Sequence, residues 1–165
     1  MSGEAPRRHA AKVLTCSDGV VAGTRDDASG RALVERLGAA GYEVVEHRVS
    51  ADGVEAVGAA LRDLVAGFAG LVLTTGGTGF GPRDLTPEAT RTVIDREAPG
   101  LSEAMRWSTF GRFPHGMLSR GVAGSVGSAL VVNLPGSPKG AVESFEVVLE
   151  ALPHALELLA GARPH

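Results

Sequence analysis

The sequence predicts a three-layer α/β/α single domain with a largely parallel central sheet, and three observations carry this prediction. Short apolar runs without polar alternation, such as residues 71–73, are typical of strands that are buried on both faces. Segments with apolar residues at helical spacing separate these runs, which favours parallel strands joined by helices. A length of 165 residues suits one domain, and we expect no second one.

The first half of the domain alternates strand and helix signals. Apolar residues at positions 33, 34 and 37 recur at helical spacing, ahead of a glycine suited to end a helix. The segment YEVVEHRV is more polar than the other expected strands, which places it near the sheet edge. In chain order, these signals predict a strand over residues 11–16, a helix over 28–40, a strand over 42–49, a helix over 52–67 and a strand over 71–75.

The second half continues the pattern. Thr86 and Pro87 supply an N-cap hydroxyl and a proline suited to the first helical position. The Ala-Pro-Gly run at residues 98–100 ends the helix that starts at Pro87. The segment SALVVN is typical of a further buried strand. These signals predict helices over residues 87–97 and 101–110, a strand over 128–133 and a helical segment over 141–161 that Pro153 interrupts.

Composition excludes several classes of protein. A net charge of −3 and a pI near 5.9 leave no broad basic surface, so we expect no nucleic-acid partner. No apolar run approaches the roughly 18 residues of a membrane span, and a lone cysteine, Cys16, forms no intrachain disulfide, so we expect a cytoplasmic protein. We interpret Cys16 as a packed strand residue. Residues 1–10 lack periodicity and predict a flexible tail before the domain at 11–165.

A glycine-rich loop follows the strand at residues 71–75, and the whole stretch reads LVLTTGGTGFGPRDLTPEATR. Glycines let the backbone adopt positive φ and bring its N–H groups against a ligand, which is how proteins cradle phosphate. A P-loop and a dinucleotide fingerprint are both excluded, because the loop has no lysine and Pro82 interrupts the G-x-G-x-x-G spacing. The candidate substrate-binding residues here are Thr75, Gly76, Gly77, Thr78 and Gly79.

The same loop carries one acid and one base. Asp84 would repel phosphate unless a cation lay between them, so we interpret it as a Mg²⁺ ligand, with a solvated turn acid as the alternative. Arg83 could meet phosphate directly. Earlier in the chain, Ser17 and Asp18 end the first strand, at the sheet edge where ligands usually bind, although a plain turn pair fits them as well.

Asp52 has two interpretations. It is followed three residues later by Glu55, just before a helical pattern, and this spacing is close to that of a capping box. Asp52 is therefore either an N-cap or a functional acid, and the two roles can coexist.

The strand at residues 128–133 repeats the design of the glycine-rich loop. It ends at Asn133 and runs into LPGSPKG, where glycine and Ser-Pro open a helix and form a second anion site. The candidate residues there are Asn133, Pro135, Gly136, Ser137 and Lys139, although a solvated lysine is the default interpretation of Lys139.

Between residues 105 and 118 lie clustered aromatic and methionine residues, which fit either core or a subunit interface, with core favoured on sequence alone.

TTGGTGFGPRDLTPEAT, together with MLSR at residues 117–120 and LPGSPKG, resembles the signature of the molybdenum cofactor biosynthesis family of Mog and MoaB-like molybdopterin adenylyltransferases. The similarity extends over residues 12–160. It implies transfer of AMP from ATP to the terminal phosphate of molybdopterin, with release of pyrophosphate. It also implies Asp52 and Asp84 as Mg²⁺ ligands, Arg83 and Lys139 opposite phosphate charge, and Ser119 at the pterin site.

The resemblance further implies a homotrimer or a higher oligomer of trimers, with transient contacts to other cofactor-biosynthesis proteins. A non-catalytic molybdopterin-binding or carrier module of the same fold is the alternative, because fold does not determine activity.

One position departs from the family's pattern. Many relatives have a basic residue where this chain has Val126, and its loss predicts weaker phosphate binding if that side chain contacts the ligand.

Overall fold

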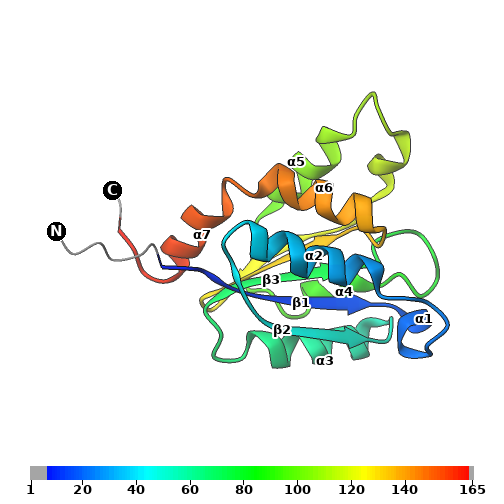
Figure 1. Ribbon diagram of the computed structural model, residues 1–165, viewed down its shortest axis with the longest axis horizontal. Coiled ribbons are helices and arrows are strands. Elements are labelled where there is room, and N and C mark those ends of the chain that lie inside the picture. Colours follow the sequence, from blue (N-terminus) through cyan, green and yellow to red (C-terminus); the bar gives the residue numbers. More distant parts are fainter. Residues whose placement is uncertain (1–6, 164–165) are drawn as a thin grey trace.

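The computed structural model describes residues 7–163, in which a six-stranded sheet lies between two helical layers (Figure 1). The strands are β1 (Ala10–Cys16), β2 (Glu43–Ser50), β3 (Gly70–Thr75), β4 (Arg96–Glu97), β5 (Ala123–Val126) and β6 (Ala129–Leu134). The helices are α1 (Asp18–Val21), α2 (Ala28–Ala39), α3 (Val54–Val65), α4 (Thr86–Arg91), α5 (Pro99–Ser108), the 3₁₀ helix η1 (Pro114–Leu118), α6 (Pro138–Val148) and α7 (Leu152–Leu159).

The strand order is β2-β1-β3-β6-β5-β4. Strands β2, β1, β3 and β6 are parallel, and β5 and β4 extend the sheet in the antiparallel sense. The predicted three-layer α/β fold with a largely parallel sheet is therefore confirmed. Because the four parallel strands point the same way, their carboxyl ends lie at one edge of the sheet, close to α1 (Figure 1). The chain enters β1 and leaves α7 at the opposite edge.

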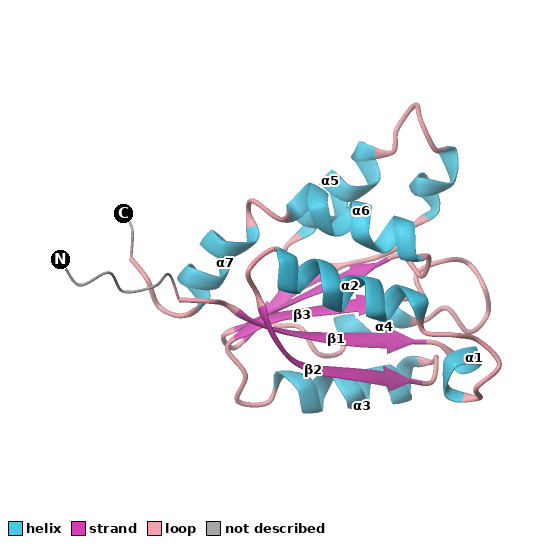
Figure 2. Cartoon of the chain, viewed as in Figure 1, coloured by secondary structure: helices cyan, strands magenta, loops and turns pink. Residues whose placement is uncertain are grey.

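Helices cover both faces of the sheet (Figure 2), and a core of buried side chains lies on each face. On one face, α2, α5, α6 and α7 pack against Leu71 and Leu73 of β3, and on the other, α3 and α4 pack against Val72. Every residue of β3 is buried, as expected for a central strand with helices on both sides. Among residues 7–163, no helix is both long and apolar enough to span a bilayer.

The predicted helix over residues 87–97 is wrong in its second half. Helix α4 ends at Arg91, and the chain then forms β4, which pairs with β5. Gly124 makes this pairing possible, because a Cβ atom there would lie 2.5 Å from the carbonyl oxygen of Arg96. The β-branched residues Thr92, Val93 and Ile94 have low helix propensity, which weakens the helix there. The pairing of β4 with β5 is non-local, so no local signal predicted it.

Three further boundaries differ from the prediction. The short helix α1 forms within the expected loop, because the side chain of Ser17 caps it by accepting from the N–H of Val20. Pro153 lies in the first turn of α7 and does not interrupt a helix, since α6 already ends at Val148. Of the predicted tail, residues 1–6 lie outside the described residues, and Ala10 already belongs to β1.

Candidate functional site

A cavity of about 620 Å³ lies at the carboxyl edge of the parallel strands, a volume typical of small-molecule sites. Loops after β1, β2, β3 and β6 all contribute to it. Of the predicted site residues, nine line the cavity: Ser17, Asp52, Thr75, Gly76, Gly77, Thr78, Gly79, Asp84 and Gly136. The remaining seven lie outside the lining: Asp18, Arg83, Ser119, Asn133, Pro135, Ser137 and Lys139.

The glycine-rich loop needs its glycines for two reasons. Gly76 and Gly77 have φ of +99° and +69°, and a Cβ atom at Gly77 would lie 2.2 Å from Oγ1 of Thr86. Gly79 and Gly81 do not have positive φ, so the expectation of positive φ throughout the loop is wrong. They instead make room for Asp84, whose Oδ2 lies 3.1 Å and 2.8 Å from where their Cβ atoms would be.

Asp18, Asp52 and Arg83 form one network that joins the ends of β1 and β2 to the loop. The N–H of Asp18 donates to Oδ2 of Asp52 over 2.9 Å, and the N–H of Asp52 donates to Oδ1 of Asp18 over 3.1 Å. Arg83 donates from Nε and Nη2 to the carboxylate of Asp18 and from Nη2 to the carbonyl oxygen of Asp52. Arg83 therefore holds the carboxylate of Asp18 and the backbone of Asp52, while its side chain stays 60% exposed.

The two acids of this network have opposite pKa shifts. The hydrogen bonds from Arg83 hold the pKa of Asp18 below its usual value. Burial raises the pKa of Asp52, and the negative charges of Asp18 and Asp84 raise it further. A raised carboxyl pKa in a cavity is typical of functional acids, which supports a functional role for Asp52.

The N-cap interpretation of Asp52 is wrong. Gly53 occupies the N-cap position of α3, with φ of +106° and no side-chain cap bond. The carboxylate of Asp52 instead accepts from the N–H of Asp18 and faces the cavity. Its functional role stays a prediction, alongside the structural contact with Asp18.

The segment after β6 brings the N-terminal end of α6 to the cavity. Gly136 and Pro138 line the cavity where α6 begins, and Ser137 caps α6 by accepting from the N–H of Gly140. Lys139 points outward: its side chain is 86% exposed, with Nζ 3.9 Å from Glu143. Its solvated interpretation therefore fits the structure better than a phosphate contact.

Asn133 and Ser119 make internal contacts. The buried amide of Asn133 donates to Oγ1 of Thr74 and of Thr90, and its oxygen accepts from the N–H of Val122. Asn133 thus joins β3, α4 and the segment before β5, and its side chain has no polar atom left for a ligand. Oγ of Ser119 accepts weakly from the N–H of Gly121 over 3.4 Å, so its place at the pterin site stays a prediction.

Sequence reasoning missed the role of Arg120. Its backbone N–H donates to the carbonyl oxygen of Thr78, and its guanidinium donates to the carbonyl oxygens of Gly79 and Asp84 over 2.8 Å and 2.5 Å. The same guanidinium pairs with Glu88 and lies over the ring of Phe80. Arg120 therefore holds the glycine-rich loop from both ends. The MLSR segment contained the signal, but nothing in a sequence shows what a loop arginine will contact.

Val126 lies away from the cavity, and Cys16 lies at its wall as a buried thiol. Val126 pairs with Ala129 at the edge of the sheet opposite the cavity, so the expected loss of a phosphate contact has no geometric basis within this chain. Cys16 is buried and lines the inner wall of the cavity, and burial raises the pKa of its thiol to about 12. Cys16 is thus protonated at neutral pH, as its packing interpretation predicts.

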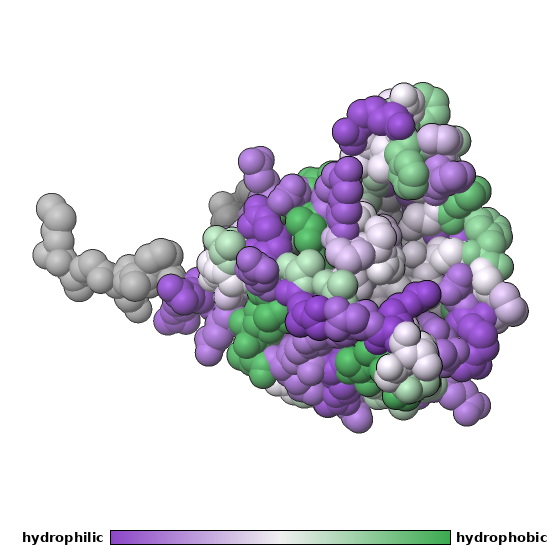
Figure 3. Space-filling model, turned by 45° about the vertical axis from the view of Figure 1, so that its right-hand side comes forward, coloured by the Kyte–Doolittle hydropathy of each residue, from purple (hydrophilic) through white to green (hydrophobic). Residues whose placement is uncertain are grey.

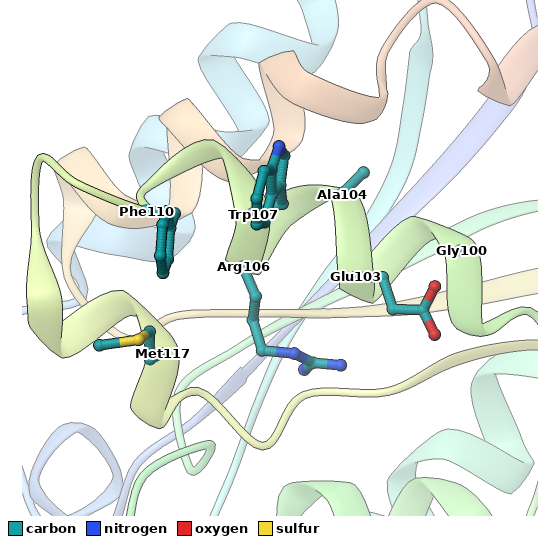
Figure 4. Close-up of a pocket in the computed structure, with 7 residues that line it drawn as sticks. All are labelled: Gly100, Glu103, Ala104, Arg106, Trp107, Phe110 and Met117. Atoms are coloured by element: carbon teal, nitrogen blue, oxygen red, sulfur yellow. The ribbon is translucent and has the colours of Figure 1, made fainter.

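A second hollow, of about 630 Å³, lies on the lobe formed by α5 and η1, residues 99–118, which we call the aromatic lobe (Figure 4). Trp107 and Phe110 stack with centroids 5.0 Å apart and are 71% and 59% exposed. Phe113 and Met117 are also more than half exposed. Of this cluster only Met105 is buried in the core, so the core interpretation is wrong for the rest. The lobe projects from the domain and shows apolar surface among polar residues (Figure 3).

Known proteins are similar to this chain over most of its length. A family model described as a probable molybdopterin binding domain matches residues 12–154. The chain is 37% identical over 152 residues to a molybdopterin adenylyltransferase of Helicobacter pylori (strain J99), covering 90% of this chain and 86% of that protein. It is 46% identical over 89 residues to the molybdenum cofactor synthesis protein cinnamon of Drosophila melanogaster, covering 54% of this chain.

A solved structure, the molybdopterin biosynthesis enzyme MoaB from Thermus thermophilus, superimposes with a TM-score of 0.86 at 46% sequence identity. The superposition covers 93% of this chain and 98% of MoaB. The match to cinnamon, in contrast, spans only 15% of that protein's length. The same domain therefore occurs both nearly alone and as a small part of longer chains.

Proposed function

Because the chain belongs to the family of probable molybdopterin binding domains, we propose that it transfers AMP from ATP to the terminal phosphate of molybdopterin, in molybdenum cofactor biosynthesis. The name of the Helicobacter relative, which aligns over most of this chain, supports the reaction. The observation that carries the proposal is the cavity itself. It combines a glycine-rich loop, the start of α6 and two acids, Asp52 and Asp84, at one sheet edge.

The reaction joins two anions. An oxygen of the pterin phosphate attacks the α-phosphorus of ATP, a new P–O bond forms, and the bond from the α-phosphorus to the bridging oxygen breaks to release pyrophosphate. Little covalent chemistry falls to the protein, so alignment and neutralisation of charge account for most of the rate enhancement. Backbone N–H groups of residues 77–79 and the N-terminal end of α6 present partial positive charge to the phosphates, while the N–H of Gly76 donates to the carbonyl oxygen of Leu134.

The acids of the cavity fit Mg²⁺ bound together with substrate. Among residues 7–163, no group of three or more His, Cys, Asp or Glu side chains could hold a metal ion. Mg²⁺ commonly takes one or two carboxylates and completes its shell with water and phosphate oxygens. Asp52 and Asp84 would supply these carboxylates, and their mutual repulsion, which helps raise the pKa of Asp52, favours a cation between them. When bound, Mg²⁺ neutralises phosphate charge.

The proposal is tested with purified protein, ATP, Mg²⁺ and molybdopterin, by measuring adenylylated pterin and pyrophosphate together. Equal amounts of both products are expected. The carrier alternative predicts pterin binding with neither product, and that result would overturn the proposed activity. Assays without Mg²⁺, or with excess chelator, are expected to lose both products if Asp52 and Asp84 act as described.

We also propose that the protein assembles as a homotrimer or a higher oligomer of trimers. The exposed aromatic lobe supports this, because aromatic residues and methionine are enriched in the cores of interfaces. The same proposal includes a cytoplasmic location, which the free thiol of Cys16 suggests. It also includes transient contacts with other cofactor-biosynthesis proteins that supply pterin or accept the product.

A further inference from the structure

The cavity has an unusual balance of charge for a site that receives phosphates. Three acids line it, Asp26, Asp52 and Asp84, and Arg25 is the one cationic side chain that does so within residues 7–163. The two bases that sequence reasoning favoured are engaged elsewhere. Arg83 is bound to Asp18, and Lys139 points into solvent. A cationic side chain that adds to Mg²⁺ and the backbone N–H groups is therefore to be sought elsewhere in the cavity lining.

Arg25 is placed and available for this role. It lies in the loop between α1 and α2, and its N–H donates to the carbonyl oxygen of Gly19, which fixes the start of the side chain. Within the described part of the chain, no hydrogen bond or ion pair engages its guanidinium. The neighbouring carboxylate of Asp26 is already taken, because Arg31 donates to both of its oxygens. Arg25 is thus an arginine at the cavity wall with a free guanidinium.

We infer that Arg25 binds a phosphate group of the substrate. The inference rests on the proposed function for the identity of the phosphate, which either ATP or molybdopterin can supply. A guanidinium suits it, because its planar fork donates two parallel hydrogen bonds to a phosphate. Arg25 is exposed, so it can approach a phosphate from the mouth of the cavity after the substrate has entered. The bond would be charge-assisted and salt-dependent.

Three variants test the inference. Arg25→Gln removes the charge, Arg25→Lys keeps the charge without the fork, and Arg96→Gln is the matched control. Arg96 is likewise an exposed arginine, and it lies on β4, the edge strand farthest from β2 in the sheet order. Dissociation constants for ATP, molybdopterin and inorganic tripolyphosphate are measured by calorimetry at two salt concentrations, with KM and kcat from the pyrophosphate assay.

Arg25→Gln is expected to weaken binding of tripolyphosphate and of one substrate by about tenfold or more, the loss typical of a hydrogen bond to a charged group. KM for that substrate should rise more than kcat falls, and Arg25→Lys should recover part of the loss. The substrate that is affected identifies the source of the phosphate. Affinities within twofold of those of Arg96→Gln, or no binding of tripolyphosphate by the unaltered protein, would overturn the inference. Intact binding without pyrophosphate release would instead overturn the proposed function and leave the Arg25 result standing.

Discussion

At the scale of single residues, ionisation of Asp52 lowers the stability of the folded state. Its pKa in the folded protein is raised above the unfolded value near 3.8, chiefly by burial. The folded state is therefore favoured by this group below the unfolded pKa, and that contribution is lost as the pH rises through the folded pKa. At neutral pH the charged carboxylate disfavours folding relative to a neutral side chain. Asp18, with its lowered pKa, has the opposite dependence: it stabilises above its unfolded pKa, and that contribution is lost in acid.

Asp52→Asn is expected to separate stability from activity. Asparagine keeps the oxygen that accepts from the N–H of Asp18 and removes the buried charge, so the thermal midpoint at pH 7 should be equal or higher. At pH 4 the difference between variant and parent should shrink. Pyrophosphate release should fall by about a hundredfold or more, since a lost metal ligand costs several kcal/mol of charge stabilisation. A lower midpoint at pH 7 together with full activity would contradict both parts of this account.

Asp84→Asn tests the second acid separately. Its carboxylate accepts from the N–H of Gly81, an acceptor role that the asparagine oxygen preserves, so folding should be little changed. We expect a loss of turnover comparable to that of Asp52→Asn, with molybdopterin affinity within about threefold of the parent because only the metal ligand is removed. Calorimetry with pterin and the pyrophosphate assay measure the two effects. Normal turnover in both folded variants would exclude the two-carboxylate mechanism.

At the scale of elements, Arg120 makes the glycine-rich loop a rigid part of the site. One side chain from the segment before β5 holds two loop carbonyl oxygens and an acid at the start of α4. Glycines would otherwise leave the backbone flexible, because they lose more conformational freedom on ordering than other residues. The loop thus owes its alignment to a residue about 40 positions away in the chain.

Arg120→Lys should loosen the loop without unfolding the domain. A lysine keeps the charge but cannot donate to Gly79, Asp84 and Glu88 together. We expect kcat/KM to fall by about tenfold or more, with a decrease in thermal midpoint of a few degrees, corresponding to about 1 kcal/mol. Amide exchange of residues 79–81 should accelerate. Arg91→Lys, which changes an exposed arginine paired with Glu97, is the control. Unchanged exchange in the Arg120 variant would show that the loop is held by other contacts.

Local patterns in the sequence predicted the parallel strands, the helices between them and the edge of the sheet at which the cavity lies. Buried strands are mostly apolar, and the loops after them carry glycine and caps, so local composition is sufficient there. The pairing of β4 with β5, the internal role of Asn133 and the contacts of Arg83 and Arg120 were not predictable. Each depends on which distant segment the fold brings near, and no local pattern records that.

At the scale of the whole molecule, the aromatic lobe predicts assembly. A monomer would leave Trp107, Phe110 and Phe113 in water, whereas burial of apolar surface contributes about 25 cal/mol per Å². We therefore expect light scattering to show a trimer, or a multiple of it, at micromolar concentration. Replacing Trp107 and Phe110 together by glutamate should shift the protein toward monomers, while Leu158→Glu on the exposed side of α7 should not. A stable monomer of the unaltered protein would reject the prediction.

The entry of the chain into β1 and its exit from α7 at the edge opposite the cavity have a consequence for modular architecture (Figure 1). A second domain covalently joined at either end would extend away from the edge that carries the cavity and leave the cavity accessible. Such a layout makes the domain easy to combine with others during evolution, in keeping with its match to a small share of cinnamon. It also makes either terminus a suitable place for a reporter or a surface tether.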